Sequence, residues 1–129
     1  MRFGLHVRHE ALYKVAAVDD VIDIAHILGE LQLEALTSRD AAIVFWFSPA
    51  LHRFINPAAT GFLLAATSFS ARTVPILRGD ILITSHDTAG NAVGLSQREI
   101  NRLLFHPPNF WEVRILSRRF AAAGITSAA

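Results

Sequence analysis

The chain has 129 residues, of which 52% are apolar and 18% are charged, and its 12 basic and 11 acidic residues leave a net charge of +1. This length predicts one domain over residues 1–129 that can bury its own core. The absence of cysteine excludes disulfides, zinc thiolate sites, iron–sulfur clusters and thiol nucleophiles.

The first third of the sequence predicts a hairpin followed by a helix. Residues Arg2–Val7 alternate between apolar and polar side chains, and the apolar run Leu12–Val18 follows after a short turn. Asp19 and Asp20 can cap a helix that ends near Gly29. Its apolar stripe has helical spacing and consists of Val21, Ile24, Leu28 and Leu31.

Two more strands and a second helix are predicted next. Residues Leu31–Leu36 and Ala41–Phe47 read as a pair of strands. The second of these is apolar throughout, so we expect a central strand that is covered on both faces. Asn56 and Pro57 form an N-cap and first-turn pair that opens a helix through Ala66.

The last third begins with the strand Ile81–Thr84, a turn and a short strand at Val93. Ser96 and Glu99 then form a capping box for a helix over Gln97–Phe105. Pro107 and Pro108 end that helix.

For Phe110–Leu116 we favour a strand, because Val113 and Ile115 are β-branched. Asn109 with Glu112 would equally cap a helix. The predicted fold is therefore α+β, with a largely antiparallel sheet and two to three packed helices, because most connections are too short for parallel crossovers.

No secretory signal is recognisable in Met1–Glu10, which carries charge and lacks an apolar core. The uncharged stretch Phe54–Ala71 contains too many polar residues for a membrane span. We therefore expect a cytoplasmic protein with no membrane partner.

From Asp19 to Leu104 the chain resembles a family of small uncharacterised proteins, a domain of unknown function carried by bacteriophages and plasmids. The resemblance rests on the order of short pieces, namely Gly29-Glu30, Leu33–Ala35, Asn56–Thr60, Pro75-Ile76, Arg78–Ile83, Asp87, Gly90-Asn91 and Gly94–Ser96. It implies an origin on a mobile element and roles such as tuning the host or blunting its defences. It brings no catalytic residues, and the C-terminal extension 109–129 departs from it.

One cluster of like charge stands out as a candidate binding surface. It contains Arg98 and Arg102 on the capped helix together with Trp111, Arg114, Arg118 and Arg119 further on. This cluster is either an ordinary solvent-exposed face or a site that binds an anion or a nucleic acid, in which Trp111 stacks on a base.

Enzymatic constellations are weaker. The six histidines lie on elements that need not converge, so we expect no bound metal and no cofactor. His86 and Asp87, with His52, suggest a small hydrolase with a base and its orienting carboxylate. The alternative is a polar turn in which Asp87 bonds its own backbone.

These observations leave three functional hypotheses. The first is a non-enzymatic accessory protein of a phage or plasmid that binds and blocks or sequesters a host factor, counter-defence being one such role. The second is a nucleic-acid contact protein that uses the C-terminal arginines, and the third is the hydrolase. We also expect a homodimer, because the low charge leaves apolar surface exposed and Arg2–Val7 and Phe110–Leu116 are candidate sheet edges without Lys or Pro.

Overall fold

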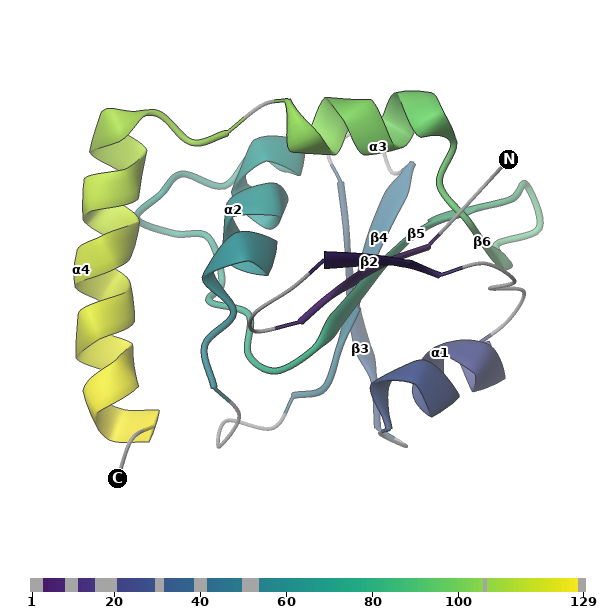
Figure 1. Cartoon of the computed structure of the whole chain (residues 1–129), viewed down its shortest axis with the longest axis horizontal. Coiled ribbons are helices and arrows are strands. Elements are labelled where there is room, and N and C mark those ends of the chain that lie inside the picture. The colour runs from purple at the N-terminus through teal and green to yellow at the C-terminus, as the bar shows by residue number, and fades with distance from the viewer. Residues whose placement is uncertain are drawn as a thin grey trace.

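A computed structural model describes residues 4–8, 12–15, 21–29, 32–38, 42–49, 54–105 and 107–127. The described strands and helices follow one another along the chain in the predicted order as far as α3, with two strands before each helix (Figure 1). In chain order they are β1 (Gly4–Val7), β2 (Leu12–Val15), α1 (Val21–Leu28), β3 (Glu34–Thr37), β4 (Ile43–Phe47), α2 (Pro57–Ala66), β5 (Ile81–His86), β6 (Ala92–Val93), α3 (Gln97–Leu104) and α4 (Phe110–Ser127).

The strands form one antiparallel sheet in the order β2-β1-β5-β4-β3, with β6 also paired to β5. The three predicted strand pairs, β1 with β2, β3 with β4 and β5 with β6, are all present. β4 lies inside the sheet, and three consecutive residues of it are buried, as expected for a strand that is covered on both faces. The predicted α+β fold is confirmed.

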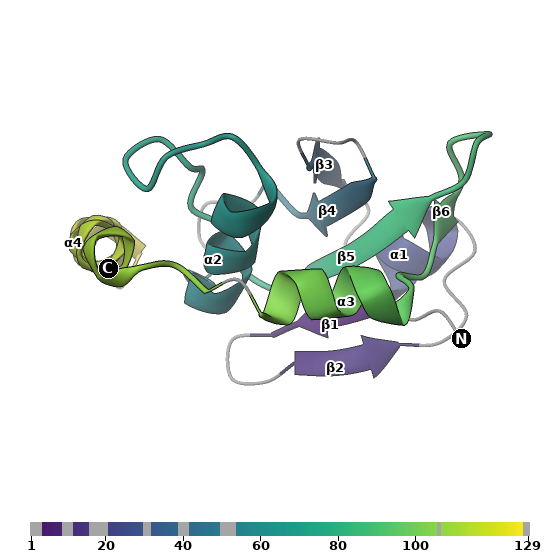
Figure 2. The ribbon, with the colours of Figure 1, turned by 90° about the horizontal axis from the view of Figure 1, so that it is seen from above.

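Alternating residues of β5 point to two separate cores. Ile81 and Ile83 contribute to the larger core with Leu63 of α2 and Ile100 of α3. Leu82 packs on the opposite face against Ile24 of α1. Helices therefore cover both faces of the sheet, and α1 and α3 lie on opposite sides of the strands (Figures 1 and 2).

Helix α2 is fixed to the sheet by a buried polar network. The Asn56 carboxamide oxygen accepts a bond from the Ala59 N–H at 3.1 Å, which caps the helix as predicted. The Asn56 amide donates to the carbonyls of Val7 and Gly79, both at 2.9 Å. The Thr60 hydroxyl donates to the Asn56 carbonyl and accepts from the Leu77 N–H. We call these groups the Asn56 network.

The prediction of a strand over Phe110–Leu116 is wrong, because these residues begin helix α4. The Asn109 side chain accepts a bond from the Glu112 N–H at 2.9 Å, and the Glu112 carboxylate accepts one from the Asn109 N–H at 3.0 Å. This reciprocal pair satisfies two backbone donors at the helix start. It outweighs the small preference of two β-branched residues for a strand.

The edges of the sheet also differ from the prediction. β1 lies between β2 and β5, and Phe110–Leu116 belongs to no strand. Neither of the two segments expected at a sheet edge therefore forms an edge. Among the described strands, β2 and β3 end the sheet order. The edge-pairing argument for a homodimer therefore loses its basis, while the oligomeric state itself stays a prediction. Within the described part of the chain, no helix combines the length and the apolar character that a membrane crossing requires.

Candidate binding groove

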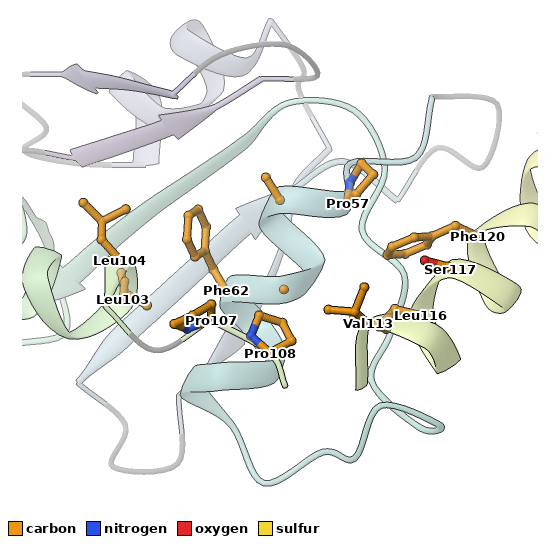
Figure 3. A pocket seen from close by; sticks show the side chains of 12 residues that line it. Pro57, Phe62, Leu103, Leu104, Pro107, Pro108, Val113, Leu116, Ser117 and Phe120 are labelled. Carbon is orange, nitrogen blue, oxygen red and sulfur yellow. The ribbon is translucent and has the colours of Figure 1, made fainter. Parts of the chain in front are cut away.

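A groove of about 530 Å³ opens between α2, α3 and α4 (Figure 3). α2 and the Pro107-Pro108 pair lie in its middle, with the end of α3 on one side and the first half of α4 on the other. We use "the groove" for the cavity lined by Pro57, Ala58, Gly61, Phe62, Leu103, Leu104, Pro107, Pro108, Val113, Leu116, Ser117 and Phe120.

Local sequence explains why this space is not filled. The diproline ends α3 and forces an extended connection before α4 can start, which separates the two helices. The side of α2 that lines the groove carries two small residues, Ala58 and Gly61, beside Pro57 and Phe62. A methyl group added at Gly61 would meet only the Pro108 ring, at 3.7 Å. The space is therefore a consequence of short side chains opposite a rigid linker.

The described lining of the groove is almost entirely apolar. Among the described residues that line it, Ser117 alone has a polar side chain, and the other side chains are aliphatic, aromatic or absent. Leu103 and Leu116 are buried and belong to the main core, so the floor of the groove continues that core to the surface. Such a surface holds a ligand by removing apolar area from water.

Large apolar side chains also stand exposed around the α3–α4 connection. Phe105 and Phe110 are 73% and 66% exposed, and Trp111 is 68% exposed. Leu104 and Val113, which line the groove, are 39% and 47% exposed. Exposed apolar residues that gather in one region mark an interaction surface more often than residues scattered singly. Of the seven large hydrophobic residues that are exposed in the described part of the chain, five lie here.

The predicted arginine cluster is only partly brought together. At about 100° per residue, Trp111, Arg114 and Arg118 share the outward side of α4, away from Leu116. The Arg114 guanidinium lies 5.9 Å from the ring centroids of both Phe110 and Trp111. Arg119 instead points inward and donates to the Ala71 carbonyl at 2.9 Å, which fastens α4 to the loop after α2.

Arg98 and Arg102 occupy a different place. Both are exposed on α3, and Arg98 lies in the first turn, at the end of the helix that points away from α4 (Figures 1 and 2). The predicted cluster is therefore two groups on two helices, with the diproline connection between them.

The geometry at His86 and Asp87 confirms the turn interpretation. The Asp87 carboxylate accepts bonds from the N–H groups of Ala89 and Asn91, both at 2.9 Å, and from the Asn91 side chain. These bonds, foremost the one from the Asn91 backbone, lower the pKa of Asp87. The His86 imidazole Nδ1 lies 3.0 Å from the Asp87 backbone carbonyl. The carboxylate closes a hairpin, and His52 lies outside the described residues.

A pair that the sequence did not predict joins His6 and Asp80. The His6 Nε2 atom lies 3.0 Å from an Asp80 carboxylate oxygen, and the Arg8 Nε atom lies 3.5 Å from the same oxygen. His6 and Asp80 are 74 positions apart in the sequence, so only the pairing of β1 with β5 brings them together. In the residues that the structure describes, no three His, Asp or Glu side chains gather as metal ligands would.

Comparisons of this chain with family models, with curated proteins and with solved structures found no match.

Proposed function

We propose that this protein is a non-enzymatic binding protein that holds an apolar partner in the groove. The observation that carries the proposal is the groove itself, an open apolar cavity of about 530 Å³ that continues the core and is bordered by exposed aromatic residues. A volume of this size lies within the range of ordinary ligand sites, roughly 300–1,000 Å³.

The biological setting belongs to the same proposal. The resemblance over Asp19–Leu104 supports an accessory protein of a phage or plasmid that binds and blocks or sequesters a factor in the host cytoplasm. Pro57 and Ala58 lie inside this span, and Val113 and Phe120 lie in the extension beyond it. The extension thus supplies one wall of the groove, which supports a specialised binding role.

The test uses the neutral apolar dye Nile red and two matched variants of α2. We expect saturable binding to the wild-type protein. Ala58→Glu places a carboxylate in the groove and should weaken dye binding at least about tenfold, because an apolar ligand cannot compensate a desolvated charge. The first turn of α2 has no acidic residue, and a glutamate there interacts favourably with the helix N-terminus, so the variant should fold.

Ala65→Glu is the control, since Ala65 is exposed on the same helix and does not line the groove. It should bind Nile red like the wild-type protein. Dye binding that is absent, or equally strong in the Ala58→Glu variant, would overturn the proposal.

A second candidate function is nucleic-acid contact through the outward side of α4, favoured by the Arg114 guanidinium over the Phe110 and Trp111 rings. Bases stack on such exposed aromatic residues, and arginine adds phosphate contacts. Anisotropy of labelled single-stranded and duplex oligonucleotides tests it. Affinity should fall steeply with salt, by about 0.9 in the log–log slope for each duplex phosphate neutralised, and Trp111→Ala should weaken it. No binding at low salt would exclude this function.

A further inference from the structure

On the basis of the proposed function, we infer that the occupant of the groove is an amphipathic helix of another protein, with acidic residues along the flanks of its apolar stripe. The inference names the class of partner, which the proposed function leaves open. It rests on the backbone chemistry of the lining, on the exposure of the rim and on the distribution of charge along the chain.

The lining comes almost entirely from helices, whose backbone donors and acceptors bond one another. A partner in extended conformation would bring unpaired N–H and C=O groups into the groove and find few partners there, at a cost for each buried group. A helix carries its backbone bonds within itself. It can therefore place an apolar stripe against Phe62 and Leu103 without leaving polar groups unsatisfied.

The rim argues for a macromolecule with a broad surface. Leu104 and Val113 line the groove and yet stay 39% and 47% exposed, and Phe105 and Phe110 beside the diproline are 73% and 66% exposed. A single acyl chain lying in the groove would leave these side chains in water. A helix, with a diameter of about 10–12 Å including its side chains, reaches from the groove to the rim.

Charge is distributed unevenly along the chain. The α3–α4 segment, residues 97–127, holds five arginines and two glutamates, a net charge of +3. The remaining residues hold seven basic and nine acidic side chains, a net charge of −2. The near-neutral total therefore hides a basic segment that supplies two of the three walls of the groove, although Arg98 lies at the far end of α3 and Arg119 is bonded to the Ala71 carbonyl.

The two glutamates do little to offset this charge toward a partner. The Glu99 carboxylate accepts a bond from the Ser96 N–H, and the Glu112 carboxylate accepts one from the Asn109 N–H. Both carboxylates thus face the start of their own helix, while the Arg114 side chain is exposed and lies about 60° around α4 from Ser117, which lines the groove. Opposite charge on the partner is favoured beside such a surface, and like charge is disfavoured.

The same charge argues against a second copy of this chain as the occupant. A two-fold dimer through the groove would place two α3–α4 segments against each other, each with a net charge of +3. Repulsion between them would oppose the contact.

Three synthetic peptides of about 18 residues, roughly five helical turns, test the inference. They share one apolar leucine stripe and differ only in the flanking residues, which are Glu, Gln or Lys. We expect affinity in the order Glu, Gln, Lys at low salt, with about tenfold or more between the first and the last, and a smaller difference at high salt. Ala58→Glu should weaken the Glu peptide, and Ala65→Glu should not.

Arg114→Glu should reduce the preference for the Glu peptide over the Lys peptide several-fold, since the Arg114 guanidinium lies beside the Phe110 ring and Arg114 is about 60° around α4 from Ser117, which lines the groove. Arg72→Glu makes the same change of charge at an exposed position in the loop after α2 and should keep the preference. Equal binding of the three peptides, or a preference that Arg114→Glu leaves intact, would overturn the acidic flank.

Further outcomes separate this inference from the proposed function. If Nile red binds and none of the peptides does, the helical partner is wrong and the binding groove stands. If neither dye nor peptide binds, both fall. Light scattering with size exclusion completes the test. A dimer that loses its partner on Ala58→Glu would identify a second copy as the occupant and overturn the inference.

Discussion

The two sides of helix α2 meet opposite surroundings. The side with Asn56 and Thr60, both buried, faces the sheet, and its polar groups are bonded to the backbone of β1 and of the loop before β5. The side with Ala58 and Gly61 faces the groove, which is apolar and open to water. One helix thus buries polar groups beside the core residue Leu63 and leaves small apolar residues uncovered on its other side.

The difference shows which side carries stability and which side is available for binding. A buried polar group that loses its partner costs free energy, so we expect substitutions in the Asn56 network to lower the free energy of unfolding. The groove leaves apolar area in contact with water, and an added partner would remove it. Stability and binding should therefore respond to different residues of α2.

The largest effect on stability should come from Asn56→Ala. The substitution removes the N-cap acceptor and leaves the buried Val7 carbonyl and the half-buried Gly79 carbonyl without the Asn56 donor, so the unfolding free energy should fall by about 2–4 kcal/mol. Nile red affinity should be unchanged at temperatures where the variant is folded. Chemical denaturation and dye titration measure the two quantities. Asn101→Ala, at an exposed position of α3, should cost less than about 0.5 kcal/mol. An equal loss at both positions would refute the role of the network.

Thr60→Val should have a smaller effect on the same side of the helix. Valine matches the shape of threonine and deletes the hydroxyl, which donates to the Asn56 carbonyl and accepts from the Leu77 N–H. The Leu77 N–H would be left buried without a partner, and we expect a loss of about 1–2 kcal/mol by denaturation. Thr37→Val on the exposed face of β3 is the matched control and should be near neutral. A neutral Thr60→Val would show that water or another group replaces the hydroxyl.

On the groove side, Gly61→Ala should stabilise the protein by up to about 1 kcal/mol. Alanine lowers the entropy lost when the helix forms, and the added methyl group meets the Pro108 ring only at an ordinary contact distance of 3.7 Å. Thermal unfolding measures the gain. Gly90→Ala should have the opposite sign, because Gly90 has a φ of +85°, which an L-residue adopts with strain. Destabilisation at Gly61 would mean that the diproline packs too rigidly to accept a methyl group.

Local signals predicted much of this fold. Asn56 with Pro57, and Ser96 with Glu99, are caps whose partners lie within three residues, and both helices begin where those signals place them. Alternation and apolar runs located the strands for the same reason, although β3 spans Glu34–Thr37 where Leu31–Leu36 was predicted. At Phe110–Leu116 two local signals disagreed, and the reciprocal Asn109–Glu112 bonds decided for a helix.

Short sequence patterns could not predict the candidate site. The groove needs Pro57, Leu103 and Phe120 to converge from three helices, and the angle between those helices depends on packing. The sequence identified Trp111 and Arg114 as notable and overlooked the apolar residues beside them, since an apolar side chain in a helix is usually core. The His6–Asp80 pair was missed because it requires the order of strands in the sheet.

The smallest effect is expected at Asp87, far from both sides of α2, and it depends on pH. Bonds from the Asn91 backbone N–H and its neighbours favour the ionised carboxylate and lower its pKa below the ordinary 3.8. A lowered pKa adds stability above the ordinary value, and that contribution is lost as pH falls through the lowered pKa. Asp87→Asn keeps an acceptor oxygen and removes the titration. The wild-type protein should therefore be more stable than the variant at neutral pH, and the difference should shrink at an acidic pH below the ordinary pKa of 3.8. Denaturation curves of both proteins at the two pH values measure it, and a difference that stays constant would show that the hairpin does not depend on the charge of Asp87.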